Sequence, residues 1–129
     1  MNKSPIQNFA KWLKVHTCLA RHRILGPYPI QLSEAQIAHI RQWAEAVTQI
    51  NEVRVFGSRT MGCSTPRSDI DLAITTSYGN FVAIAKRQER LLSDQMGVKV
   101  YIGHFNSADD LTVRRYCNRR SVMLFTRAS

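Results

Sequence analysis

The stretch VFGSRTMGCSTPRSDIDLAI, residues 55–74, decides how this chain folds and what chemistry it can carry. A glycine–serine pair, Gly57-Ser58, follows a short apolar run, and Asp69 and Asp71 stand one residue apart in a second apolar run. Because side chains alternate faces along a β-strand, a strand that starts at the first aspartate places both carboxylates on one face. The apolar residues between and after them then point to the opposite face, into a core. Two charges on an otherwise buried strand need a physical reason.

A divalent cation held between the two carboxylates supplies that reason. Neighbouring carboxylates repel each other unless a positive charge lies between them. Mg²⁺ prefers oxygen ligands and is usually held by one or two carboxylates together with water and substrate phosphates. We therefore expect Asp69 and Asp71 to be metal ligands and catalytic residues, with Mg²⁺ as the cofactor.

The glycine–serine pair predicts a turn that binds phosphate. Gly57 has no Cβ, so a phosphate can approach its backbone, and a helix starting after it would direct unpaired N–H groups at the anion. The Ser58 hydroxyl and the Arg59 guanidinium can add donors, and Ser68 flanks the first aspartate. These four residues form the expected nucleotide-binding set. Either motif alone is weakly specific, and capping or surface aspartates are the alternative; the two motifs together are more specific.

The residues around this stretch predict an α/β (α+β) domain with a small mixed β-sheet flanked by helices. Ser33 and Gln36 form a capping-box pattern before a helical apolar repeat. Short β-branched runs then alternate with helical patterns, in the order αβαβαβαβ. After the helix that starts at Ser33, the expected elements are strands 53–56, 69–75, 98–102 and 122–125, a short helix after Ser58, and helices 81–96 and 107–118.

Residues 1–31 are expected to form a basic extension, with a helix over 5–20, ahead of a domain over 32–129. Five basic and no acidic side chains lie in the extension, and the whole chain has 18 Lys and Arg against 9 Asp and Glu, a net charge of +9. Such a surface favours polyanions, which leaves nucleic acid, nucleotide phosphates and an acidic protein open as partners. A surface that serves solubility alone is the alternative.

We expect this protein to be cytoplasmic and not to enter a membrane. No apolar run approaches the length of a membrane span, and the first residues are too polar for a secretory signal. Cys18, Cys63 and Cys117 match neither a zinc spacing nor a disulfide framework, which favours free thiols in a reducing compartment.

The pattern of Gly57-Ser58, ten residues, and Asp69-x-Asp71 resembles the minimal nucleotidyltransferases of the DNA polymerase β superfamily. The resemblance covers residues 33–125. It includes the helix from Ser33 followed by INEVRVFGSR as the opening helix–strand unit, GVKVYIGHF as the strand after the second helix, and VRRYCNRRSVMLF as the closing helix and strand. It implies that the glycine–serine turn binds a triphosphate and that the two aspartates hold Mg²⁺.

One position departs from the pattern of that family. Its members usually carry a third carboxylate on the adjacent strand, and alignment puts Tyr101 in its place. A tyrosine with a pKa near 10 is a poor metal ligand or base at neutral pH. Loss of the third acid affects activation of the attacking hydroxyl most, whereas nucleotide binding needs only the turn and the first two acids.

The resemblance leaves two functions open. Stand-alone minimal members of the family serve as antitoxins that transfer AMP from ATP to a tyrosine of a small helical toxin of the HEPN type. The short chain has no room for a separate small-molecule substrate domain, which favours a protein acceptor. The alternative is a catalytically impaired module that binds nucleotide, a protein partner or RNA.

Overall fold

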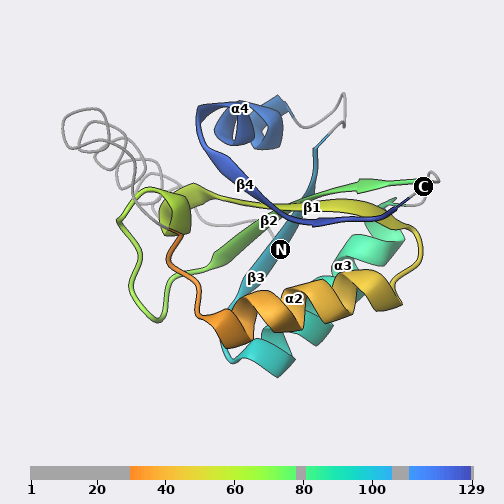
Figure 1. Ribbon diagram of the computed structural model, residues 1–129, viewed down its shortest axis with the longest axis horizontal. Helices are drawn as coiled ribbons and strands as arrows, with labels where there is room; N and C mark the ends of the chain where they lie inside the picture. Colours follow the sequence, from red (N-terminus) through yellow and green to blue (C-terminus); the bar gives the residue numbers. More distant parts are fainter. Residues whose placement is uncertain (1–29, 78–80, 106–110, 129) are drawn as a thin grey trace.

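A four-stranded mixed sheet organises the computed structural model, which describes residues 30–77, 81–105 and 111–128 (Figure 1). The strand order is β3-β2-β1-β4; β1 runs antiparallel to both β2 and β4, and β2 runs parallel to β3. The expected mixed sheet is therefore confirmed. The strands are β1 (Ile50–Phe56), β2 (Ile70–Thr76), β3 (Val100–His104) and β4 (Ser121–Thr126).

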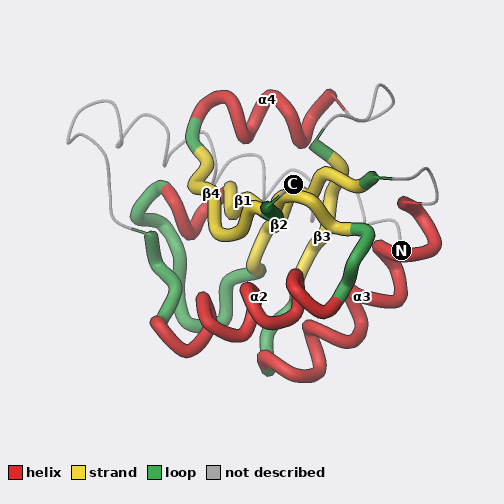
Figure 2. Tube along the Cα trace, turned by 45° about the vertical axis from the view of Figure 1, so that its right-hand side comes forward, coloured by secondary structure: helices red, strands yellow, loops and turns green. Residues whose placement is uncertain are grey.

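Helices cover both faces of this sheet. Helices α2 and α3 lie on one face and α4 lies on the other, as Figures 1 and 2 show from two directions. A single 3-10 turn, η1, takes the place of the short helix expected after Ser58. The helical elements are α2 (Glu34–Ala46), η1 (Gly57–Thr60), α3 (Phe81–Met96) and α4 (Leu111–Arg119). The expected helix over 5–20 and the expected start at residue 107 lie outside the described residues.

Helix α2 is closed at both ends by side chains. Ser33 and Gln36 form the expected capping box, with bonds of 2.9 and 3.0 Å between side chain and backbone. At the other end, the Arg127 guanidinium donates to the carbonyl oxygens of Ala44 (2.7 Å) and Val47 (3.2 Å). A cation near a helix C-terminus satisfies orphan carbonyl groups and complements the helix dipole.

Strand boundaries differ from the sequence expectation where pairing overrides composition. β1 begins at Ile50 instead of residue 53, because Ile50 and Glu52 pair with Thr76 and Thr75 at the end of β2. β3 begins at Val100 instead of residue 98, after Gly97 has ended α3 with a positive φ of 71°. β2 begins at Ile70, so Asp69 lies one residue before the strand.

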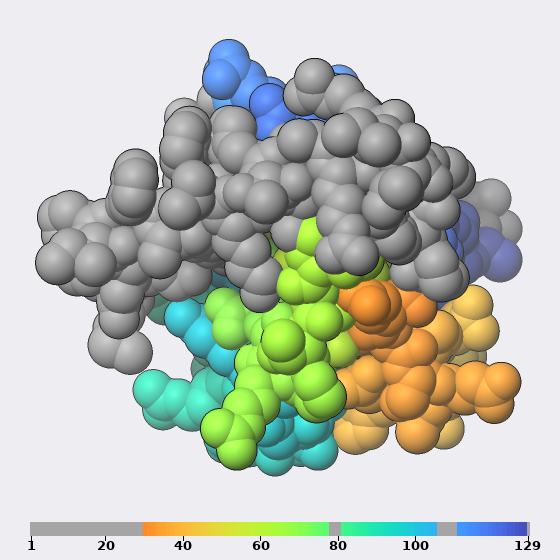
Figure 3. Space-filling model, turned by 90° about the vertical axis from the view of Figure 1, so that its left-hand side faces the viewer, coloured from red at the N-terminus to blue at the C-terminus, as the bar shows by residue number. Residues whose placement is uncertain are grey.

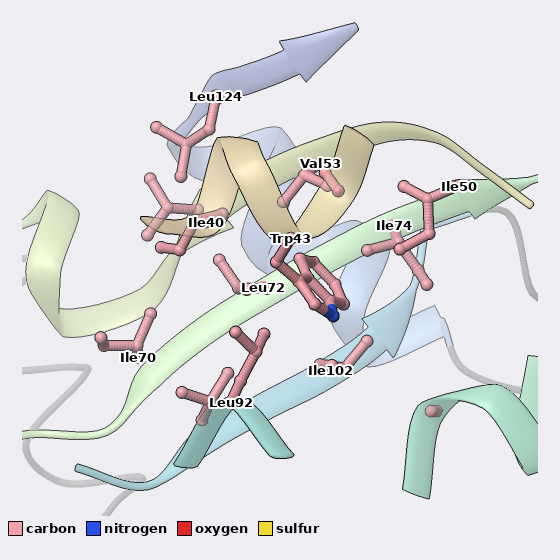
Figure 4. Packing of buried hydrophobic residues seen from close by; sticks show 14 residues of the cluster. Ile40, Trp43, Ile50, Val53, Ile70, Leu72, Ile74, Leu92, Ile102 and Leu124 are labelled. Carbon is pink, nitrogen blue, oxygen red and sulfur yellow. The ribbon is translucent and has the colours of Figure 1, made fainter. Parts of the chain in front are cut away.

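The main hydrophobic core lies between the sheet and helices α2 and α3 (Figure 4). Alternate residues of the strands enter it, and most of its aliphatic side chains are fully buried. Helix α2 adds the ring of Trp43, whose indole N–H donates to Gln88 of α3 at 2.7 Å. The buried members are Ile40, Trp43, Ala44, Ile50, Val53, Val55, Ile70, Leu72, Ile74, Ala85, Leu92, Val100, Ile102 and Leu124.

The face under α4 is packed by a much smaller cluster. Its buried members are Phe56, Ala73, Val113 and Cys117. Partly buried aromatic side chains surround them, and the ring of Phe56 stacks on Tyr116 with centroids 6.3 Å apart. This face therefore has fewer apolar contacts, and it leaves space on the sheet for polar side chains.

The β3 edge of the sheet is closed by side chains of α3. The backbone N–H of Val100 donates to the Ser93 hydroxyl at 2.9 Å, and the N–H of Ile102 donates to the Glu89 carboxylate at 2.8 Å. Two outward donors of an edge strand are thus satisfied within the chain.

Candidate active site

The glycine–serine turn and the aspartates meet because β1 ends where β2 begins. In the antiparallel register Phe56 lies opposite Asp71, so the turn that follows β1 packs beside the start of β2. Gly57 has a φ of +81°, which disfavours other residues. A Cβ at this position would overlap Oδ2 of Asp71 and lie 3.3 Å from its Cγ. Glycine is required here both for its backbone conformation and for the close approach of the carboxylate.

Both aspartates influence the guanidinium of Arg59, although only Asp71 lies in β2. Asp71 is buried in β2 and Asp69 is half-buried just before the strand, so the expectation of a strand beginning at Asp69 is wrong. Both carboxylates nevertheless act on Arg59. Burial lowers the pKa of the Arg59 guanidinium, and the negative charges of Asp71 and Asp69 oppose that shift. The two acids are therefore close enough to one buried cation to influence it.

Arg59 is only 4% exposed, and its guanidinium bonds to the backbone of the loop that carries Asp69. It donates to the carbonyl oxygens of Gln31 and Ser68, both at 2.8 Å. Weaker bonds of 3.4 and 3.3 Å reach the carbonyl oxygens of Thr65 and Pro66. Sequence analysis assigns Arg59 to phosphate binding, whereas these contacts give it a role in shaping the loop.

The two serines of the expected site differ in what their hydroxyl groups do. Ser68 is buried; its hydroxyl accepts a 2.8 Å bond from the Thr65 amide, and its own amide donates to the Thr65 carbonyl at 3.0 Å. Ser58 is half-buried, and its hydroxyl forms no hydrogen bond with any of the described residues. Ser58 is therefore the better placed of the two to donate to a bound phosphate.

Tyr101 lies where the resemblance predicts the missing third acid. The parallel register of β2 and β3 pairs Asp71 with Tyr101. The Tyr101 ring packs edge-on against Phe56, with centroids 6.5 Å apart. It also leans over Gly103, where an added Cβ would lie 3.1 Å from Cε1 and 3.3 Å from the hydroxyl oxygen. The position facing Asp71 is thus filled by an aromatic ring.

The donor set suits a magnesium ion that is shared with a substrate. Among the described residues no group of three or more His, Cys, Asp and Glu side chains could hold a metal by itself. Asp69 and Asp71 supply two carboxylates, and Gly57 brings the glycine–serine turn into direct contact with the second of them. Because Mg²⁺ usually takes one or two carboxylates and completes its shell with phosphate and water, these residues fit it.

Two residues near the site were not found by sequence reasoning. The Gln31 side chain accepts bonds from both the amide, at 3.0 Å, and the hydroxyl of Ser64. The Arg120 Nε donates to the Thr60 carbonyl at 2.7 Å and joins the end of α4 to η1. Neither a glutamine before a helix nor an arginine in a basic segment carries a pattern that reveals such a contact.

The cysteines differ from each other. Cys117 is a free thiol on the buried face of α4, as the sequence suggested. Cys63, in the loop after η1, is disulfide-bonded, so the expectation of a free thiol is wrong at this position.

A family model identifies the chain. The model described as polymerase beta, nucleotidyltransferase, matches residues 38–129, which is most of the sequence and includes both motifs. The chain belongs to the polymerase β nucleotidyltransferase family. The resemblance drawn from the two motifs is therefore confirmed, and so is the α/β class of the fold. Among curated proteins no significant match was found.

Solved structures with this fold include antitoxins bound to toxins. One is the toxin–antitoxin pair MntA–HepT, with a TM-score of 0.56 and 14% identity over 74% of each chain. A second is a tri-AMPylated HEPN toxin in complex with its MNT antitoxin from Shewanella oneidensis, with a TM-score of 0.57, 15% identity and 74% of each chain. A third, a toxin–antitoxin complex with AMP-PNP, has a TM-score of 0.57 and 18% identity, over 74% of this chain and 75% of that one.

None of the helices among the described residues is both long enough and apolar enough to cross a bilayer.

Proposed function

We propose that this chain binds a nucleoside triphosphate, ATP, together with Mg²⁺, and transfers AMP to a protein acceptor of the HEPN toxin type. The observation that carries the proposal is the packing of Gly57 against Asp71, which joins the glycine–serine turn and the aspartates into one site. Support for the acceptor comes from the neighbours: one is a complex with an AMPylated HEPN toxin, and another contains AMP-PNP. Because the sequence identity is low, the similarity to these structures shows the fold alone.

Each residue has a distinct role in this proposal. Asp69 and Asp71 provide the carboxylate oxygens that would hold Mg²⁺, and Ser58 donates its hydroxyl to a phosphate oxygen beside Gly57. Arg59 and Ser68 shape the loop between the two motifs. The bound cation would supply neutralisation of charge on the phosphates and a lower pKa for the attacking hydroxyl.

The transfer itself is a substitution at the α-phosphorus. The acceptor hydroxyl oxygen forms a bond to phosphorus, the bond to the β-phosphate bridging oxygen breaks, and pyrophosphate leaves. The acceptor proton passes to solvent or to a carboxylate of the site. Positioning and electrostatic stabilisation account for most catalysis of this kind, which suits a small rigid site.

The first experiment is calorimetric titration of ATP, with and without Mg²⁺, into wild type and an Asp69→Asn/Asp71→Asn double variant. Wild type is expected to bind ATP more tightly with Mg²⁺, and the double variant is expected to lose that difference. Circular dichroism checks that the variant folds. Equal binding by both proteins, or no Mg²⁺ effect in wild type, would contradict the proposed site.

The second experiment tests the acceptor. A candidate acceptor of the HEPN type, incubated with the chain and MgATP, is expected to gain the mass of AMP on a tyrosine, as seen by intact-protein and peptide mass spectrometry. The double aspartate variant is the control and should leave the partner unmodified. A partner that stays unmodified although wild type binds MgATP would separate binding from transfer.

A second candidate function is nucleotide binding without transfer, and Tyr101 favours it. The ring lies directly opposite Asp71, where a third carboxylate would activate the acceptor. A Tyr101→Asp variant restores that carboxylate, with Tyr101→Phe as the matched control that removes only the hydroxyl. This candidate would be established if wild type binds MgATP without transferring AMP and the Tyr101→Asp variant transfers AMP. Transfer by wild type and by Tyr101→Phe would contradict it.

Nucleic acid is not part of this proposal. Two of the arginines near the C-terminus, Arg120 and Arg127, bond to backbone carbonyl groups within the fold. Arg114 and Arg119 lie over aromatic rings, with their guanidinium carbons 5.7 and 5.9 Å from the centroids. Four of the C-terminal arginines thus have contacts within the chain itself, and these contacts need no polyanion.

A further inference from the structure

The segment just before α2 is bonded to the loop between the two motifs. The Gln31 amide donates to the Arg59 carbonyl at 2.8 Å, and the Gln31 carbonyl accepts from the Arg59 guanidinium at the same distance. The Gln31 side chain in turn accepts from the amide and hydroxyl of Ser64. Figure 3 shows this contact from outside, where the segment coloured orange packs against the green loop. One glutamine therefore holds two points of the loop.

The same guanidinium reaches the other end of the loop. Arg59 bonds to the carbonyl oxygen of Ser68, the residue immediately before Asp69. The arginine is buried, so these charge-assisted bonds form where water does not compete well. Gln31 fixes the middle of the loop at Ser64, and Arg59 fixes its last residue before the aspartate.

The loop needs such restraint because secondary structure does not provide it. Residues 61–69 run between η1 and β2 with no helix or strand of their own. Asp71 is fixed by the β2 ladder, whereas Asp69 lies before the first paired residue of that strand. The distance between the two carboxylates therefore depends on how the loop is held.

We infer that Gln31 and Arg59 form a clamp that positions Asp69 relative to Asp71, and so sets the Mg²⁺-dependent part of nucleotide binding. The inference rests on the proposed function, since it assigns these positioning residues to that site. Neither residue needs to touch the nucleotide. The Nη1 and Nη2 groups of Arg59 donate to backbone carbonyl groups, and Gln31 acts through Ser64 and Arg59.

The test compares wild type with Gln31→Ala, which removes the acceptor for Ser64 and keeps the backbone bonds. Gln88→Ala is the matched control. It also removes a side-chain acceptor, the one that binds Trp43, but Gln88 lies away from the loop. ATP affinity is measured by calorimetry with and without Mg²⁺, and amide exchange over residues 61–69 by hydrogen–deuterium mass spectrometry. Thermal midpoints report folding of every variant.

Gln31→Ala is expected to weaken binding of ATP with Mg²⁺ about tenfold, a change within the range expected for loss of the two bonds to Ser64, and to leave affinity without Mg²⁺ unchanged. Exchange over 61–69 should be about tenfold faster. Gln31→Glu, which keeps an acceptor oxygen, is expected to recover both. Arg59→Lys keeps the charge but cannot reach several carbonyl groups at once, so it should show the same pattern more strongly.

The outcomes separate the clamp from the function. The clamp would be overturned if wild type binds ATP in a Mg²⁺-dependent way and Gln31→Ala has the same ATP affinity and amide exchange as wild type. That result would leave the proposed function intact. Wild type without Mg²⁺-dependent binding would overturn the proposed function and, with it, the role of the clamp in nucleotide binding. Equal losses in Gln31→Ala and Gln88→Ala would show a general stability effect and also overturn the inference.

Discussion

The two faces of the sheet are built for different purposes. The face covered by α2 and α3 is lined by fully buried aliphatic side chains. The face under α4 carries buried Asp71, the half-buried Arg54 and, among the described residues, a cluster of four buried apolar side chains. The same strands supply both faces, because alternate residues of β2 point in opposite directions. The comparison teaches that the first face provides most of the stability and the second carries the candidate site.

The largest expected effect is on the stability of the first face. Ile74→Ala removes a fully buried side chain and should lower the free energy of unfolding by about 2–5 kcal/mol. Val113→Ala on the α4 side removes fewer carbons from a smaller cluster and should lower it by about 1–2 kcal/mol. Urea unfolding followed by circular dichroism measures both. Equal losses would break the comparison between the faces.

The next effect concerns how easily α4 opens. Burial raises the pKa of the Cys117 thiol to about 11, while the charge of Arg54 acts in the other direction, so the native thiol resists alkylation at pH 8. Labelling should instead occur when α4 separates locally from the small cluster. We expect the free energy of this local opening to be at least about 1.4 kcal/mol lower than the free energy of global unfolding. Peptide mass spectrometry in low urea measures it. Labelling only on global unfolding would show that both faces are one cooperative unit.

A smaller effect is expected from Asp71→Asn. The change removes the attraction between the Asp71 carboxylate and Arg59, but it also removes the cost of burying that carboxylate. Arg59 is not left uncompensated, because the charge of Asp69 and the carbonyl oxygens of Gln31 and Ser68 still act on it. The free energy of unfolding should change by less than about 1 kcal/mol, although the Mg²⁺-dependent binding of ATP is lost. Urea unfolding and calorimetry on the same sample measure both. A loss as large as that of Ile74→Ala would mean that Asp71 belongs to the stabilising core.

The smallest effect is the pH dependence due to His104, at the end of β3. Burial lowers the pKa of this histidine below its usual 6.5, where its ring packs on Phe81 and lies 3.5 Å from the Thr76 hydroxyl. The unfolded chain therefore takes up the proton first as the pH falls, and this group lowers stability below about pH 6.5. His104→Gln should flatten the stability profile between pH 7 and 5. An unchanged slope would exclude His104 as its source.

Much of the architecture could be predicted because it follows from local pattern. The capping box at Ser33 and the alternation of the strands are set by neighbouring residues, and the two motifs indicated the family. The position of Asp69 outside β2 could not be predicted, since the ladder starts where Ile70 donates to the Lys99 carbonyl, a contact distant in sequence. The contacts of Gln31 and Arg59 likewise depend on tertiary packing, because a glutamine or an arginine has the same appearance in sequence whether it binds a ligand or a loop.

The bonds from α3 to the outer edge of β3 have a consequence for how the protein can associate with other chains. Ser93 and Glu89 occupy two of the backbone donors that an added strand would need. An exposed edge strand can recruit a strand from a neighbour and extend into aggregates, and here that route is blocked at one end of the sheet. Assembly through strand addition is therefore restricted to the β4 end, and crowding or heating should not promote sheet extension through β3.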